Sequence, residues 1–176
     1  KSACSTMHLS YERVHGSRDY FRVAASSKII LEVIPVLLIA KPSKAKNVTD
    51  LSYFHVSYMK KHARGLENQV RLAKAFCQAQ GVYGAEGYIR GFSGYALECL
   101  IIYYRSFIKM LNALNKTDKP IVLDYARHYR NKNALVNMNQ SKLASPIILI
   151  DPTFKERNAL AALSNATFDK FKIAAR

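Results

Sequence analysis

The sequence predicts an α+β fold, and three patterns support this prediction. Residues 19–25 and 28–40 are rich in Val, Ile, Leu, Tyr and Phe, which favours an antiparallel hairpin. Residues 68–80 place apolar side chains at helical spacing. Residues 94–114 are almost entirely apolar or aromatic along one side, so we expect a long helix there, central to a core.

Turn and cap residues indicate where the elements begin and end. Asp50 is expected to N-cap a helix that stops at Gly65. The helix over 68–80 should end at Gly81 with a positive φ. Ser93 is expected to cap the long helix that follows it.

The last third of the chain reads as two short strands and a helix. Residues 120–125 and 146–150 predict the strands, and the polar stretch 127–142 between them is most simply a flexible surface insertion. The final helix is expected to start near Glu156. A β-rich first domain, 1–65, would then precede a helix-rich second domain, 66–176, with a small antiparallel sheet.

The charge of the chain points to an acidic partner. The 27 Lys and Arg residues outnumber the 12 Asp and Glu residues, which gives a formal net charge of +15. Such an excess attracts polyanions, and nucleic acid is the first partner to consider. The alternative is a solvated basic surface without a partner, and charge alone names no reaction.

Cysteine spacing and hydropathy indicate the kind of cellular compartment in which the chain is expected. Cys4, Cys77 and Cys99 are odd in number and far apart, so neither a disulfide framework nor a zinc site is predicted, and a cytoplasmic setting is expected. The most apolar run, 29–40, contains Glu32 and is too short for a membrane span. No signal-peptide pattern opens the chain, and we expect that both ends are cut, processed or incomplete.

Three charged or polar residues stand among apolar neighbours. Glu32 lies between Ile30 and Ile34 on one strand face, so it is either an edge-strand carboxylate facing water or a ligand for a cation such as Mg²⁺. His55 and Lys74 lie beside apolar residues at helical spacing. A satisfied core histidine and a snorkelling lysine are the simple interpretations, whereas a bound phosphate would give both cations a partner.

Two Gly-containing turns and one Arg-Asn pair suit phosphate or base contacts. The turns at 81–84 and 90–95 offer backbone amides, and Arg90 and Ser93 lie in the second of them. Tight turns alone would also explain the glycines. Arg157 and Asn158 are expected in the first turn of the last helix, where they would face a base, a phosphate or only solvent.

Taken in order, these short motifs resemble class I, archaeal-type CCA-adding enzymes, the tRNA nucleotidyltransferases of the polymerase-β-like superfamily. The resemblance spans about 19–176, and 70–95 is its strongest part. The motifs are Leu31-Glu32-Val33-Ile34-Pro35, Asp50-Leu51-Ser52-Tyr53-Phe54-His55, Val70-Arg71-Leu72-Ala73-Lys74, Gly81-Val82-Tyr83-Gly84, Arg90-Gly91-Phe92-Ser93-Gly94-Tyr95 and Asp151-Pro152 with Arg157-Asn158.

The resemblance implies a fold and a set of residue roles. Residues 1–65 would be the C-terminal part of a nucleotidyltransferase head, followed by a central nucleotide- and tRNA-binding domain. Glu32 would be the third metal-binding carboxylate, and the residues contacting CTP or ATP would be Ser52, His55, Lys74, Tyr83 and Arg157. Arg90, Ser93 and Asn158 would face the RNA.

The chain departs from the family pattern at the metal site. The family carries Asp where Glu32 stands, and its other two metal ligands come from an acid-x-acid pair that this sequence lacks. The resemblance therefore implies that an upstream segment or a partner polypeptide completes a two-Mg²⁺ site, and that this chain alone is inactive. The other hypothesis is a catalytically inactive RNA-binding relative in a ribonucleoprotein.

Overall fold

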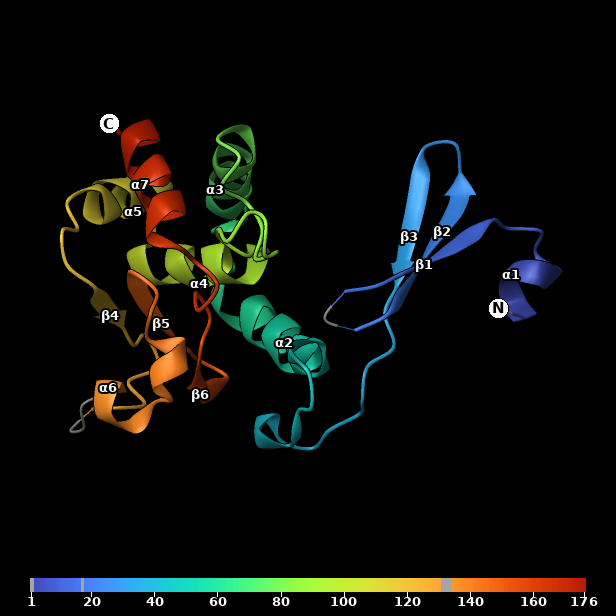
Figure 1. Cartoon of the computed structure of the whole chain (residues 1–176), viewed down its shortest axis with the longest axis horizontal. Helices are drawn as coiled ribbons and strands as arrows, with labels where there is room; N and C mark the ends of the chain where they lie inside the picture. Colours follow the sequence, from blue (N-terminus) through green and yellow to red (C-terminus); the bar gives the residue numbers. More distant parts are fainter. Residues whose placement is uncertain (1, 17, 131–133) are drawn as a thin grey trace. The chain divides into compact units, whose positions relative to one another are not determined.

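A computed structural model describes residues 2–16, 18–130 and 134–176. The chain forms two compact units, residues 1–54 and residues 55–176, and Figure 1 labels their elements. Helices are combined with two small sheets, so the predicted α+β class is confirmed. Among the described residues, no helix is long and apolar enough to span a membrane.

The first unit is built on a three-stranded antiparallel sheet. A short helix, α1 (Ser2–Thr6), precedes β1 (Tyr11–Val14), β2 (Tyr20–Ser26) and β3 (Ile29–Val33), which pair in that order. The predicted hairpin is confirmed as β2 and β3, although β3 ends at Val33 rather than near residue 40. The β1 strand was not predicted because its sequence, Tyr-Glu-Arg-Val, carries little hydrophobic pattern.

The segment after β3 is organised by a buried carboxylate. Asp50 is 3% exposed, and it accepts hydrogen bonds from the backbone N–H of Leu37 (2.8 Å) and of Lys46 (3.1 Å). Its Oδ1 lies 2.8 Å from Nη1 of Arg18. The Leu37 hydrogen bond is the main cause that lowers the pKa of Asp50. The expected N-cap role was wrong, because Asn47 caps the turn and Asp50 closes the capping box.

Helices form most of the second unit. After the 3₁₀ turns η1 (Pro42–Lys44) and η2 (Val48–Leu51), α2 (Ser52–His62) leads into it. The α3 (Glu67–Ala79) and α5 (Phe107–Asn115) helices pack against α4 (Gly94–Tyr104), and α7 (Asn165–Ala174) packs against α5. Fully buried residues of α4, including Leu97, Leu100 and Ile101, place that helix at the centre of the core, as predicted.

The predicted long helix is broken into two. Arg105 has φ 61°, in the left-handed region, and ends α4. Ser106 caps α5, whose first backbone N–H, that of Phe107, donates to Oε1 of Gln69 (2.8 Å). No Gly or Pro marks this break, so the continuous apolar pattern concealed it.

The sheet of the second unit is mixed. The β4 strand (Ile121–Leu123) runs parallel to β5 (Ile147–Asp151), and β6 (Phe154–Asn158) runs antiparallel to β5. The strands predicted at 120–125 and 146–150 are confirmed, but they pair in parallel, and the antiparallel pair is formed by β5 with β6, which was not predicted. The helix predicted near Glu156 was wrong, since the chain reverses after Asp151 into β6 and the last helix starts at Asn165.

The polar stretch 127–142 is not simply a surface insertion. Its described part contains α6 (Ala134–Asn137) and the 3₁₀ turn η3 (Gln140–Lys142), and residues 131–133 lie outside the description. Met138 is 4% exposed and packs with Ile148 and Ile150 of β5. Met138, together with the partly buried Tyr129, therefore packs this segment onto the sheet.

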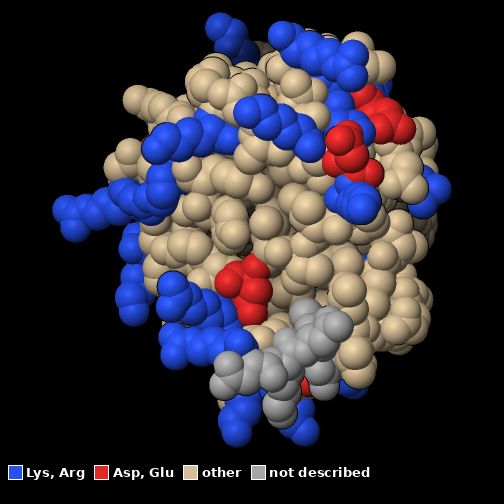
Figure 2. All heavy atoms as spheres, turned by 90° about the vertical axis from the view of Figure 1, so that its left-hand side faces the viewer, with Lys and Arg blue, Asp and Glu red and all other residues tan. Residues whose placement is uncertain are grey.

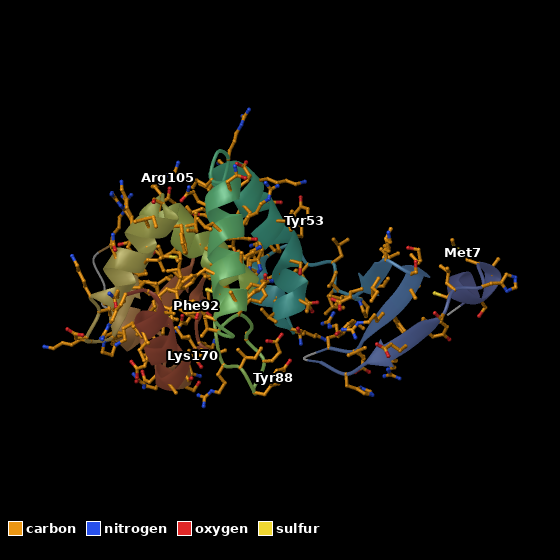
Figure 3. The ribbon with its side chains drawn as sticks, turned by 90° about the horizontal axis from the view of Figure 1, so that it is seen from above. Met7, Tyr53, Tyr88, Phe92, Arg105 and Lys170 are labelled. Carbon is orange, nitrogen blue, oxygen red and sulfur yellow. The ribbon has the colours of Figure 1, made fainter. Side chains whose placement is uncertain are left out.

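The loop between α3 and α4 returns close to its own start. Gly81 ends α3 with φ +62°, as predicted, and Tyr83 then pairs with Phe92 in an isolated bridge. Phe92 lies between the helices and is fully buried, whereas Tyr88 lies at the periphery and is 87% exposed (Figure 3). The loop is thus anchored at both ends, and α4 starts immediately after it.

Substitution of Asn158 tests whether its side chain holds the mixed sheet together. Its side-chain oxygen accepts from the N–H of Leu149 (3.0 Å) and of Leu160 (2.9 Å), and its amide donates to the carbonyl of Lys142 (2.9 Å). Asn158→Ala leaves these buried groups unsatisfied, so we expect the free energy of unfolding in urea to fall by roughly 3 kcal/mol. The exposed control Lys155→Ala should change it by less than about 0.5 kcal/mol. Similar losses for both variants would contradict the assignment.

Candidate functional site

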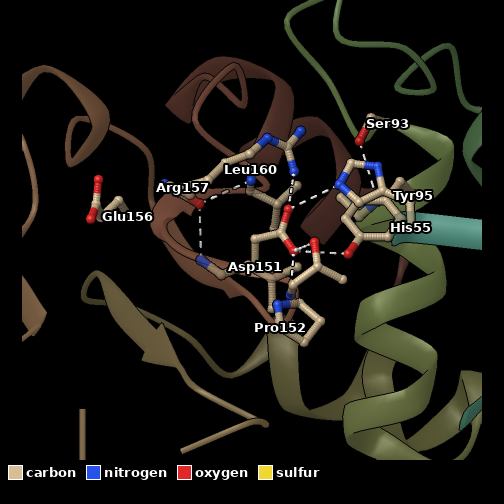
Figure 4. A network of polar contacts seen from close by, with 12 residues as sticks. His55, Ser93, Tyr95, Asp151, Pro152, Glu156, Arg157 and Leu160 are labelled. Carbon is tan, nitrogen blue, oxygen red and sulfur yellow. Dashed lines mark hydrogen bonds and ion pairs between the residues drawn. The ribbon is translucent and has the colours of Figure 1, made fainter. Parts of the chain in front are cut away.

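A buried carboxylate at the end of β5 collects donors from four elements. Oδ2 of Asp151 lies 3.1 Å from Nε2 of His55 on α2 and accepts from Nη1 of Arg157 on β6 at 2.7 Å. Oδ1 accepts from the hydroxyl of Tyr95 on α4 at 2.9 Å and from the N–H of Thr153 at 2.8 Å. Figure 4 shows these contacts converging on one side chain, which we call the Asp151 network.

The rings and the guanidinium of the network also contact one another. The ring of His55 stacks on that of Tyr95, with centroids 3.7 Å apart and planes at 17°. The guanidinium carbon of Arg157 lies 5.7 Å from the centroid of the Tyr95 ring, within the range of a cation–π contact. His55 and Arg157 are therefore each held in position by two contacts, one with Asp151 and one with the ring of Tyr95.

The Asp151 carboxyl is ionised at neutral pH. Burial raises its pKa, but the hydrogen bond from His55 and the charge of Arg157 outweigh burial, and the pKa falls well below its usual value. An ionised carboxylate only accepts hydrogen bonds, so Nε2 of His55 carries a hydrogen. This leaves Nδ1 of His55 as the ring atom that remains for a ligand. Burial also raises the pKa of Tyr95, which keeps its hydroxyl a donor.

The outer faces of the network remain accessible. Asp151 is fully buried, whereas the side chain of His55 is 12% exposed and that of Arg157 is 20% exposed. The carboxylate thus supports the two side chains from inside, and part of each reaches the surface. The remaining N–H groups of the Arg157 guanidinium can donate hydrogen bonds to a base or to phosphate oxygens, and Nδ1 of His55 faces the same site as a further polar contact.

A second cluster lies where α3, α4 and the loop between them meet. Nζ of Lys74 donates to Oε1 of Glu98 at 2.6 Å. A Cβ on Gly94 would stand 2.8 Å from the Tyr83 hydroxyl and 3.6 Å from Nζ of Lys74. The missing side chain at this first position of α4 leaves room for an ammonium and a phenol on the same side of the helix start, and both groups can donate to phosphate oxygens.

The remaining predicted site residues of the second unit have different surroundings. Arg90 is exposed and has φ 51°, and Ser93 caps α4 by accepting from the N–H of Ala96 at 3.2 Å. Asn158 is 3% exposed and its amide is used by backbone groups, because it lies in β6 rather than in the expected first helical turn. Arg157 shares that strand.

The two predicted residues of the first unit both lie at its surface. The hydroxyl of Ser52 donates to the carbonyl of Thr49 at 2.6 Å. Glu32 lies on β3 with its side chain 48% exposed, and Arg22 on β2 stands between it and Glu12, at 3.2 Å from each. Of the two interpretations left open for Glu32, its exposure fits an edge-strand carboxylate. Within the described residues, no three acidic, His or Cys side chains are grouped to hold a metal ion.

Three residues of these clusters were not assigned roles from the sequence. Asp151 and Tyr95 stood inside recognised motifs, but a role was given only to their neighbours. Glu98 lies one helical turn after Gly94. It is a single acidic residue in an otherwise apolar helix sequence, and this pattern could have indicated that it pairs with a basic side chain. The contacts across α2, α4 and β5 arise from residues far apart in the chain, so spacing alone did not reveal them.

Asp151→Asn tests whether the network depends on the charge of the carboxylate. Removing one partner of a buried ionic cluster should lower the free energy of unfolding by about 3–5 kcal/mol at pH 7. The pKa of Asp151 is lower in the folded than in the unfolded state, so its contribution is full above about pH 5 and is lost as pH falls. Urea unfolding of both proteins should therefore differ less at pH 3 than at pH 7.

The matched control is Asp118→Asn, an exposed aspartate after α5. Its effect should stay within about 0.5 kcal/mol at either pH. A difference between the wild type and Asp151→Asn that did not change with pH would show that the carboxylate acts through its shape and not through its charge.

Comparisons with known proteins match most of the chain. Residues 68–176 match the family model described as tRNA nucleotidyltransferase, second domain. The chain is 41% identical to a CCA-adding enzyme of Nanoarchaeum equitans over 162 residues. The aligned region is 92% of this chain and 41% of that protein. It is 34% identical to a CCA-adding enzyme of Saccharolobus shibatae, over 96% of this chain and 38% of that one.

A further relative is a CCA-adding enzyme of Archaeoglobus fulgidus, 30% identical over 92% of this chain and 34% of its own length. The chain thus spans about two fifths of the length of the curated relatives it matches. The matched region of the family model contains Lys74, Tyr83, Tyr95, Asp151 and Arg157. The chain belongs to the tRNA nucleotidyltransferase family, as a region of the archaeal-type CCA-adding enzymes that includes their second domain.

Proposed function

We propose that this chain is part of an enzyme that adds C, C and A to the 3′ end of tRNA from CTP and ATP. The observation that supports this most is the Asp151 network, which fixes His55 and Arg157 while part of each side chain stays exposed. In the proposed reaction the 3′-hydroxyl oxygen of tRNA bonds to the α-phosphorus. The bond from that phosphorus to the oxygen bridging it to the β-phosphate breaks, pyrophosphate leaves, and the hydroxyl proton is released to solvent.

The residues of the chain bind and orient the nucleotide in this proposal. Lys74 and Tyr83, which both lie beside Gly94, hold the triphosphate, and His55 and Ser52 contact the nucleotide. Arg157, fixed by Asp151, donates to the base and selects C or A together with the RNA. Catalysis by such groups consists of positioning and charge neutralisation. Arg90 and Ser93 are the proposed RNA-facing residues, and Arg90 is the exposed one of the two; Asn158 is left out because its side chain is buried and bonded to the backbone.

The basic surface supports a role in RNA binding. Figure 2 shows many Lys and Arg side chains and few Asp or Glu side chains on the face that carries α5, β4 and α7. The formal net charge of the whole chain is +15. A surface of this kind binds a phosphate backbone without reading its sequence, and its affinity falls as salt rises.

Magnesium chemistry would need groups from outside this chain. Glu32 offers one carboxylate, but Arg22 is its partner, and no grouped set of metal ligands exists within the described residues. We propose that an upstream segment or a partner polypeptide carries the two other carboxylates. The exposed apolar side chains of β3 are a suitable surface for packing it, with Ile30 63%, Leu31 49% and Val33 53% exposed. By this proposal the chain alone is inactive.

The alternative is an inactive RNA-binding relative, and the Glu32–Arg22 ion pair is the observation that favours it. The two candidates differ in whether the complete assembly performs chemistry, because both predict binding of tRNA.

A labelling experiment separates them. The chain is joined to, or mixed with, the polypeptide that carries the missing acid pair, and labelled CTP and ATP are offered with tRNA that lacks its 3′ end. We expect incorporation by the assembly and none by the chain alone. Glu32→Ala should lower incorporation by about 100-fold or more while tRNA binding is retained. The matched control is Glu12→Ala, which removes the other carboxylate beside Arg22 and should keep incorporation. No incorporation by the complete assembly would refute the enzyme proposal.

A further inference from the structure

A groove runs between α2, α3 and the start of α4, beside the nucleotide-contacting residues proposed above. Its volume is about 670 Å³, and apolar residues of α2 and α3 line part of it. The charged residues that line it are Lys60, Arg64, Glu67, Arg71, Lys74 and Glu98. All of them belong to the second unit, and the groove is open to solvent. Of the six, only Lys74 has a role in the proposed nucleotide site.

The groove carries more positive than negative charge, and its positive charge is partly unpaired. Lys74 is neutralised by Glu98 at 2.6 Å. Across the described parts of the chain, no carboxylate forms an ion pair with Lys60 or Arg64. Two exposed cations, four residues apart in sequence, thus line the groove without a direct ion-pair partner.

The acids inside the groove offset only part of its positive charge. Backbone amides at the start of α3 are the main cause that lowers the pKa of Glu67, and the charges of Arg71 and Arg64 lower it further. The lining still has four cations against two carboxylates, those of Glu67 and Glu98. Arg71 donates to Oδ1 of Asn68 at 3.0 Å, which leaves its other guanidinium donors unused by any described residue.

We infer that this groove is a binding site for the phosphate backbone of RNA, with Lys60 and Arg64 as its principal contacts. The charges are distributed over α2, the turn after it and α3, which suits a chain of phosphates better than a single compact anion. Lys74 lines the groove as well, so RNA lying in it would be next to the proposed nucleotide site. The choice of RNA over free polyphosphate as the ligand rests on the proposed function. The basic character of the groove rests only on the residues that line it.

The salt dependence of binding tests this inference. The ligand is a fluorescently labelled RNA hairpin with an acceptor-stem sequence and a single-stranded 3′ end, and its Kd for the 176-residue chain is measured by anisotropy at several salt concentrations. Lys60→Gln with Arg64→Gln removes two phosphate contacts, so the slope of log Kd against log salt should fall by about 1.5. Thermal unfolding of the variant should match the wild type, since both side chains are exposed.

The control removes the same amount of charge outside the groove and outside the basic face of α5, β4 and α7, with Lys41→Gln and Lys44→Gln at exposed positions beside and in η1 of the first unit. The inference expects a smaller change of slope for this pair. Equal changes would overturn it, because binding would then follow total charge alone. A second arm replaces RNA with inorganic tripolyphosphate, for which Lys74→Gln should weaken binding more than the groove variant does.

A groove variant that weakened only tripolyphosphate binding would overturn the assignment to RNA. The measurement involves no chemistry, so its result is distinguishable from failure of the labelling experiment. If the groove variant lowered the salt dependence of RNA binding but the assembly incorporated no label, the enzyme proposal would be refuted and the assignment of the groove to RNA would stand.

Discussion

One buried carboxylate holds the functional face of the second unit together. Asp151 sits at the end of a fully buried strand, where an unpaired charge would be strongly unfavourable. It is tolerated because α2, α4, β6 and the turn after β5 each supply a donor. The same contacts fix His55 and Arg157 with their outer faces accessible. The stability of the unit and the geometry of its proposed nucleotide site thus depend on the same interaction.

Local patterns in the sequence predicted the elements well where a residue type determines the backbone. Gly81 ended α3, and Ser93 began α4, because a positive φ and a side-chain cap are properties of single residues. The pattern failed at Arg105, which takes a left-handed conformation without being glycine. It failed again at β6, whose position follows from the turn at Asp151 and from pairing with β5 and not from its own hydrophobic period.

The candidate site was predictable residue by residue but not as an arrangement. Family motifs singled out His55, Lys74 and Arg157, and the structure shows that each has an acidic partner. Those partners, Asp151 and Glu98, come from distant segments, so periodicity could not pair them. The expectation that Asn158 faces RNA also depended on a helix that the structure replaces with a strand, which buries its side chain. The pairing and burial of these side chains depend on contacts between distant segments, which local sequence patterns do not reveal.

A double-mutant cycle between His55 and Arg157 tests most directly whether the Asp151 network acts as one unit. The free energy of unfolding is measured for His55→Ala, Arg157→Ala and the double variant. Both residues bond to the same oxygen of Asp151, so we expect the two effects to deviate from additivity by about 1 kcal/mol or more. Effects that add within about 0.3 kcal/mol would show that the two residues are held independently, and would contradict the account.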